Sequence, residues 1–268
     1  MVPASTIAIL ILDVVLGICV PVALSWWLVK KYKVHLSTIL IGAATFIVFA
    51  LLLESIIHNI VLNGPSGETI RGNTFYYALY GGLMAGLFEE VGRFLSMKFL
   101  LTKEPSTATP ALAYGVGHGG VEMLVIFGIG MFSTLMMAFM INSGQINDIM
   151  AQVPAEAQGQ LQTQIDQVTS SSSGTFLIGL WERFSAVILQ LSLSVLVWAA
   201  VRKGGKWLWL FPAAILIHAF VDGSLVMLKD SISMVAIEVI CSAYALAMAA
   251  LAYYVARRCF SKEPNDVS

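Results

Sequence analysis

Long apolar segments recur along this chain of 268 residues, and they constrain its fold more than any other feature. A membrane-crossing helix needs about 20 mostly apolar residues, because each residue rises about 1.5 Å and the hydrocarbon core is about 30 Å thick. Apolar side chains make up 58% of the sequence and charged ones 12%, about half of the charged fraction usual in a soluble domain. The composition excludes a soluble globular protein, a disordered chain and a repeat solenoid. The predicted spans are 5–29, 37–62, 74–101, 110–141, 174–201, 207–228 and 232–256.

Basic residues gather in alternate connections between these segments. The connections on one side hold Lys30, Lys31, Lys33, Lys98, Lys103, Arg202, Lys203, Lys206, Arg257, Arg258 and Lys262. The connections on the other side hold only Arg71 and Lys229. By the positive-inside rule, the N-terminus is expected outside and the C-terminus in the cytoplasm. The sequence therefore predicts an all-α polytopic membrane bundle of about seven transmembrane helices, with residues 1–268 as a single integral membrane domain.

The connection 142–173 falls on the outer side and contains no Lys or Arg. After Pro154, the residues Leu161, Ile165 and Val168 recur at helical spacing, which predicts a short amphipathic helix within an extracytoplasmic loop. The loop could be a simple tether, or a lid over a site in the membrane. The net charge is −1 and no basic run occurs, so nucleic acid is not an expected partner. The lipid bilayer is the expected environment.

Ionisable side chains interrupt the third predicted span. Such groups are costly in a membrane and usually face the interior of a bundle, where they mark a pathway or a reaction site. Glu89 and Glu90 are adjacent, and Arg93 lies one helical turn beyond them, so it can pair with either. One glutamate would then be held as an ion by Arg93, while the other could act as a general base or acid. A structural salt bridge is the alternative, but it leaves the second glutamate without a partner on its own helix.

Two further spans each carry a histidine and an acid four residues apart, on one helical face. These pairs are His118 with Glu122 and His218 with Asp222. Glu89 and Glu122 each lie 12 residues from the cytoplasmic end of their predicted span, and His218 lies 12 residues after Lys206, which precedes its span. That separation corresponds to about 18 Å, close to the middle of the membrane. Three helices are therefore expected to bring acid or imidazole groups to one level.

The predicted spans also contain polar residues outside these three motifs. Glu54 and His58 also stand four residues apart, and we expect them to support the main cluster from the outer half of the membrane. Glu182 and Arg183 are expected to form a salt bridge at the outer interface. Asp13 and Glu238 are single acids and are expected to be structural.

The cluster could perform hydrolysis in two ways. A carboxylate can activate water as a general base, and an imidazole can position that water or stabilise an oxyanion. Alternatively, zinc could be held by His118, Glu122, His218 and Asp222. No cofactor is certain from the sequence, and the familiar HExxH zinc motif is absent. Either design would hydrolyse a peptide bond within the membrane.

Two other classes of function fit parts of the pattern. A proton- or ion-coupled transporter also places acids and histidines at the membrane midplane. However, the two halves of the sequence show no internal repeat of the kind that many transporters have. A non-catalytic membrane scaffold is the third class.

The three motifs in order resemble those of the glutamic-type intramembrane proteases, which include PrsW and the CAAX prenyl endopeptidases (the CPBP or ABI family). The bacterial YhfC family is the most similar branch, in size, in its multi-span layout and in these motifs. The resemblance implies an enzyme of the bacterial cell membrane that cleaves a membrane-embedded or membrane-proximal peptide. Metalloprotease and glutamic-type mechanisms both remain open.

The resemblance also implies a role for each candidate. Glu89 would activate the attacking water, Glu90 and Arg93 would orient and balance it, and Glu122 would help to hold it. His218 and Asp222 would form the oxyanion side. His118 departs from the Phe of the related second motif and adds a potential metal ligand, and Asp222 departs from the Asn common in the CAAX enzymes.

Overall fold

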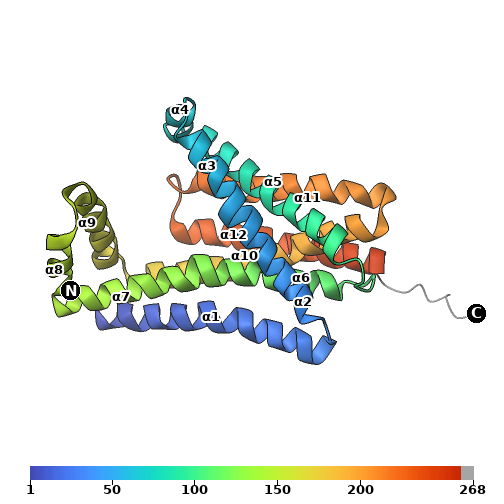
Figure 1. Cartoon of the computed structure of the whole chain (residues 1–268), viewed down its shortest axis with the longest axis horizontal. Coiled ribbons are helices and arrows are strands. Elements are labelled where there is room, and N and C mark those ends of the chain that lie inside the picture. The colour runs from blue at the N-terminus through green and yellow to red at the C-terminus, as the bar shows by residue number, and fades with distance from the viewer. Residues whose placement is uncertain (261–268) are drawn as a thin grey trace, which may run out of the picture. The chain divides into compact units, whose positions relative to one another are not determined.

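The computed structural model describes residues 1–260, and these residues form helices and no strands. Lys262, one of the residues used to predict the topology, lies outside this range. The elements in chain order are α1 (Ala4–Tyr32), α2 (Leu36–Phe46), η1 (Ile47–Glu54), α3 (Ser55–Leu62), α4 (Gly67–Arg71), α5 (Thr74–Leu100), α6 (Thr109–Glu122), η2 (Met123–Gly128), α7 (Ile129–Ser143), α8 (Gln145–Gln152), α9 (Ala155–Ser170), α10 (Ser173–Lys203), η3 (Gly205–Trp209), α11 (Leu210–Leu228) and α12 (Met234–Phe260) (Figure 1).

The predicted all-helical membrane architecture is confirmed. Among the described residues, six helical segments are long and apolar enough to cross a membrane: Ala4–Tyr32, Leu36–Leu62, Thr109–Ser143, Ser173–Lys203, Gly205–Leu228 and Met234–Phe260. The helix α5 matches the third predicted span in length but contains Glu89, Glu90, Arg93 and Lys98, and it is not one of the six. The count of seven spans therefore stays a prediction.

Residues pack into two compact units. The first comprises Met1–Val20 and Met123–Arg183, and the second comprises Pro21–Glu122 and the residues from Phe184 onward. In the first unit, the apolar core includes Leu10, Leu135 and Val168. The helix α9 begins directly after Pro154 and contributes Val168 to this core, while the shorter α8 precedes it in the same connection.

The second unit is built around α10, whose side chains from Leu189 to Trp198 fill the main core. Trp198 and Leu193 have no exposed surface, and Tyr114 of α6 packs with them. In contrast, large apolar side chains on the outer helices are exposed, including Phe99, Leu216 and Leu246. Extensive exposed apolar surface is what lipid contact requires, so the exposed faces agree with a protein that lies in a bilayer.

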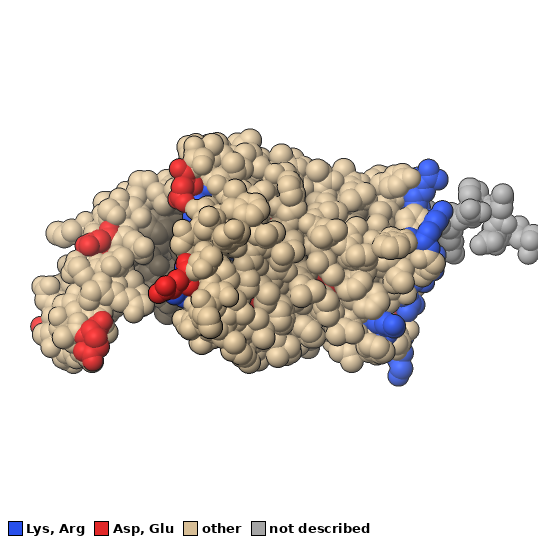
Figure 2. All heavy atoms as spheres, turned by 90° about the horizontal axis from the view of Figure 1, so that it is seen from above, with Lys and Arg blue, Asp and Glu red and all other residues tan. Residues whose placement is uncertain are grey.

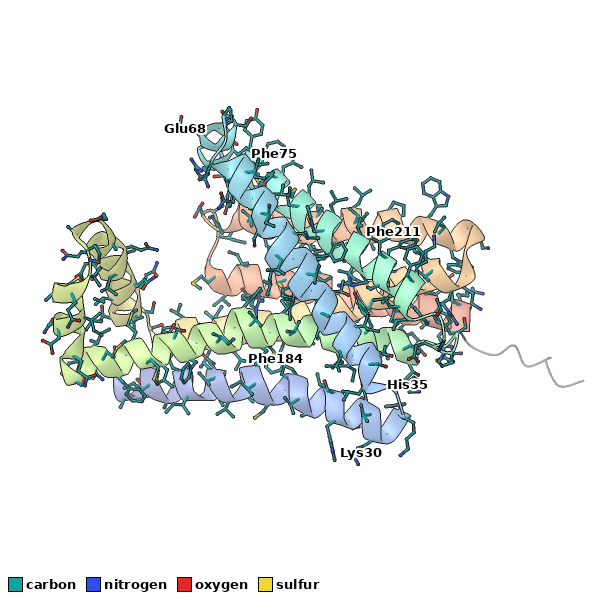
Figure 3. All side chains as sticks on the ribbon, viewed as in Figure 1. Lys30, His35, Glu68, Phe75, Phe184 and Phe211 are labelled. Carbon is teal, nitrogen blue, oxygen red and sulfur yellow. The ribbon has the colours of Figure 1, made fainter. Side chains whose placement is uncertain are left out.

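Basic side chains mark one end of the second unit (Figure 2). They stand in the last turns of four helices, as Lys30 and Lys31 of α1, Lys98 of α5, Arg202 and Lys203 of α10, and Arg257 and Arg258 of α12. Figure 3 shows Lys30 near the end of α1, His35 at the start of the long α2–η1–α3 segment, and Glu68 beyond the far end of that segment. By the positive-inside rule, this basic end is expected to face the cytoplasm. The orientation of the chain in the membrane stays a prediction.

Glycines allow the helices that carry the polar cluster to approach closely. A Cβ on Gly82 of α5 would lie 2.3 Å from the backbone oxygen of Ala219 on α11, and one on Gly86 would lie 2.5 Å from that of Ile215. Likewise, a Cβ on Gly117 of α6 would lie 1.9 Å from the backbone oxygen of Ile39 on α2. Backbone contact of this kind is typical of helix pairs packed in membranes.

Two neighbouring glycines of α5 offer a test of this packing. We expect Gly82→Ala to lower the free energy of unfolding by about 1–3 kcal/mol, because the new methyl group must push α5 and α11 apart. Gly81→Ala is the matched control, since a Cβ there meets nothing within 4 Å. It should raise stability by about 0.5–1 kcal/mol, as alanine does in a helix interior. Thermal unfolding of both variants in detergent measures the difference, and equal midpoints would contradict the close packing.

Candidate functional site

The polar cluster predicted for the third span lies on one buried stretch of α5. Glu90 and Arg93 have no exposed surface, and Glu89 is 7% exposed. All three face the interior of the second unit, where α6, α10 and α11 supply their partners. Burial of three ionisable groups demands that each be hydrogen-bonded or paired.

Arg93 forms its ion pair with Glu90 rather than with Glu89. Its Nη1 donates to both carboxylate oxygens of Glu90, at 2.7 and 2.9 Å. On the other side, Nδ1 of His218 lies 2.9 Å from Oε1 of Glu90 and can donate to it. Glu90 therefore sits between a guanidinium and an imidazole, and its charge is balanced within the protein.

Glu89 has a different environment, and within residues 1–260 its hydrogen-bond partners come from α6 and α10 rather than from Arg93. Its Oε2 lies 2.8 Å from Nε2 of His118 and accepts a second hydrogen bond from Nε2 of Gln190 at 2.9 Å. His118 is fully buried, and its ring packs against Phe46 and Tyr114. Two adjacent glutamates of one helix thus have distinct partners, which is the arrangement that separates the roles of two carboxyl groups.

Gln190 of α10 joins the parts of the cluster, and the sequence reasoning missed it. Its side-chain nitrogen donates to Glu89 and to Oε2 of Glu122, both at 2.9 Å, and its oxygen accepts from Nη2 of Arg93. The available signal was a single amide in an otherwise apolar or hydroxyl-bearing stretch of the fifth span. Glu122, the predicted partner of His118, is joined to the cluster by its hydrogen bond from Gln190 instead.

His218 and Asp222 form the less buried side of the cluster. Nε2 of His218 lies 3.5 Å from Oδ2 of Asp222, and the Asp222 side chain is 39% exposed. His218 itself is buried. A substrate could therefore reach the imidazole from the Asp222 side, while the Glu90 side is closed by protein.

Glu54 and His58 lie beside this cluster, as expected from their spacing. Glu54 is 8% exposed and lies within range of charge interaction with Glu89, His218 and Asp222. Its Oε1 is 3.0 Å from Nε2 of His58. Glu54 is also the last residue of the π-helix η1, and a second π-helix, η2, begins directly after Glu122. Such π-helical turns are frequent at functional sites.

The remaining predicted polar residues lie elsewhere. Glu182 and Arg183 pair with each other, as the sequence predicts. Asp13 is fully buried in the first unit, and neither of its carboxylate oxygens has a hydrogen-bond partner among residues 1–260. Glu238 is 7% exposed on α12.

The donor types in the cluster suit zinc, which takes imidazole nitrogen and carboxylate oxygen. However, among residues 1–260 no three His, Cys, Asp or Glu side chains converge on a common point that could hold a metal ion. The predicted set of His118, Glu122, His218 and Asp222 is divided, because His118 pairs with Glu89 and Glu122 pairs with Gln190. The arrangement does not fit a bound zinc ion.

Comparison with known proteins agrees with the motifs. The family model described as YhfC intramembrane metalloprotease matches residues 16–241. A relative from Bacillus subtilis (strain 168), named "Uncharacterized membrane protein YhfC", is 36% identical over 234 residues, which cover 87% of this chain and 88% of the relative. No solved structure matches the chain. The family description is compatible with zinc, whereas the side-chain geometry is not arranged around it.

The match contains all the cluster residues, from Glu54 to Asp222, and the long apolar helices are those of an integral membrane protein. The chain belongs to the YhfC intramembrane metalloprotease family.

Proposed function

We propose that this protein is an intramembrane endopeptidase in which Glu89 activates water to hydrolyse a membrane-embedded or membrane-proximal peptide. Membership of a family described as intramembrane metalloproteases supports a protease function in the membrane. The observation that carries the proposal is the separation of the two glutamates. Arg93 and His218 neutralise Glu90, whereas Glu89 is hydrogen-bonded to His118 and Gln190.

In this mechanism, the Glu89 carboxylate removes a proton from water while the water oxygen attacks the peptide carbonyl carbon. The C–N bond then breaks, and Glu89 returns the proton to the leaving amine nitrogen. His118 and Gln190 hold the Glu89 carboxylate in one orientation throughout. Glu122, bound to the same Gln190 amide, supports the water from its other side.

His218 would stabilise the negative charge that develops on the carbonyl oxygen. With a proton on each nitrogen, the ring donates to Glu90 through Nδ1 and presents Nε2–H on the Asp222 side. A donor fixed in this way stabilises an oxyanion without reorganising during the reaction. Glu90 and Arg93 therefore act by positioning His218.

Hydrolysis by this protein can be tested with purified material in lipid vesicles. A library of single-span peptides is incubated with the protein in ¹⁸O-labelled water, and the products are identified by mass spectrometry. The proposal predicts two fragments per cleaved peptide, with ¹⁸O in the new carboxyl group. Transport of protons or ions across the vesicle membrane without any cleavage would overturn it.

Metal content provides an independent check of the mechanism. Because the candidate ligands are hydrogen-bonded in separate pairs, we expect no stoichiometric zinc in the purified protein. Elemental mass spectrometry of the wild type is compared with the variants His118→Ala and His218→Ala. One zinc ion per chain that is lost in both variants would contradict a metal-free site, would require the cluster to rearrange around a metal, and would make Glu89 or Glu90 a base that acts on metal-bound water.

A further inference from the structure

A chain of three polar side chains leads away from the cluster and is not used by the mechanism above. Glu54 is followed by His58, whose Nε2 lies 3.0 Å from Oε1 of Glu54. The other ring nitrogen of His58, Nδ1, lies 2.9 Å from the hydroxyl of Tyr80 on α5. The imidazole therefore bridges a buried carboxyl group and a phenol through its two opposite nitrogens.

The two ends of this chain lie in different surroundings. Glu54 is buried, and the charged groups that face it are Glu89 of α5 and His218 and Asp222 of α11. Tyr80 lines an open cavity of about 390 Å³, which it shares with the hydroxyl-bearing residues Ser66, Thr69 and Tyr76. The chain thus begins near the proposed base and ends at an open cavity lined by α4 and the first turns of α5, at the opposite end of α5 from Lys98.

Hydrolysis creates a need for such a connection. Glu89 gives the proton that it took from water to the leaving amine, so Glu89 is regenerated. The amine fragment leaves the site as the neutral amine and takes up its second proton from the solvent. The new carboxylic acid of the other fragment ionises within the buried site, so its proton must leave by a separate route. Until that proton departs, it is available to protonate Glu89 and stop the next turnover.

We infer that Glu54, His58 and Tyr80 carry this proton out of the site, an inference that rests on the proposed endopeptidase function. Glu54 accepts the proton from the new carboxyl group. Nε2 of His58 then takes the proton from Glu54, and Nδ1 releases its own proton toward the Tyr80 hydroxyl and the water of the cavity. One proton enters and one leaves, so Glu54 returns to its ionised form. His58 is left with its proton on Nε2, and exchange of that proton to Nδ1 through the water of the cavity resets the ring for the next turnover. Glu54 and His58 are positioning and proton-transfer residues, while Glu89 remains the base.

The substitution Glu54→Gln tests this role because it preserves shape and can still hydrogen-bond to His58, but it cannot carry a proton. We expect steady-state turnover to fall by about 100-fold, the lower end of what a positioned proton-transfer group contributes. The first turnover should be affected much less, because proton release follows bond cleavage. Steady-state turnover of the variant should also rise with added small diffusible buffers and change its dependence on pH. Tyr80→Phe and His58→Gln should show the same pattern.

Glu68→Gln is the matched control, since Glu68 is an exposed acid at the same end of the molecule and outside the hydrogen-bonded chain. It should leave every rate unchanged. If Glu54→Gln slows the first and later turnovers equally, or leaves turnover and its pH dependence as in the wild type, the proton route is wrong. The endopeptidase function would survive that result, because it depends on wild-type cleavage and on the loss of cleavage in Glu89 variants.

Discussion

Replacing Glu89 by glutamine is expected to lower the rate of peptide cleavage by about 10²–10⁴-fold, the usual contribution of a general base. The amide has the shape of the carboxylate and retains an oxygen that can accept from His118 and Gln190, the two partners seen in the structure. It cannot remove a proton from water. The fall should therefore appear in the catalytic rate, with little change in the folding of the protein. Single-turnover cleavage of a membrane peptide in vesicles measures it directly.

Two comparisons make this result specific to the base. Glu90→Gln changes the adjacent glutamate, which contacts Arg93 and His218 rather than the proposed water position. It should therefore lose stability as well as activity. Glu68→Gln, an exposed acid, should be unaffected in both respects. If Glu89→Gln retained wild-type cleavage at an unchanged unfolding midpoint, Glu89 would not be the base.

The helical membrane architecture could be predicted from the sequence because one physical requirement dominates it. Backbone polar groups in lipid must be satisfied within a segment, so long apolar runs become helices. The ends of the predicted spans agree with the helices to within a few residues, as in α5, which was expected at 74–101 and spans Thr74–Leu100. The helices α8 and α9 show that the long connection also folds, but only α9 had a clear periodic signal.

The pairing of the cluster residues was harder to predict from the sequence. Spacing indicates which residues of one helix can meet, and it correctly allowed Arg93 to pair with Glu90. It also suggested a pairing of His118 with Glu122, whereas the structure pairs each with a group from another helix. Contacts between helices depend on their rotation and approach, which glycine positions such as Gly82 and Gly117 permit but do not specify. For the same reason, Gln190 could not be connected to the cluster from its own span.

The buried pair of Arg93 and Glu90 predicts the largest effect on stability. Both side chains have no exposed surface, and Arg93 also donates to Gln190. Removing one partner of a buried ion pair leaves the other charge uncompensated, which typically costs about 3–5 kcal/mol. We therefore expect Arg93→Met to lower the free energy of unfolding by that amount. Denaturant titration in mixed micelles measures the change.

A double variant separates the loss of charge balance from the loss of packing. When Glu90→Gln is added to Arg93→Met, neither charge of this pair remains, and the glutamine oxygen can still accept from Nδ1 of His218. Most of the lost stability should return, because removing both charges of a buried pair is often nearly neutral. Arg183→Met is the control for an ion pair that is not fully buried, since the Glu182 side chain is 33% exposed. Such pairs contribute about 0–1 kcal/mol. If the single and double variants were equally unstable, Arg93 would stabilise the bundle by packing alone, and Glu90 would not need its charge to be balanced.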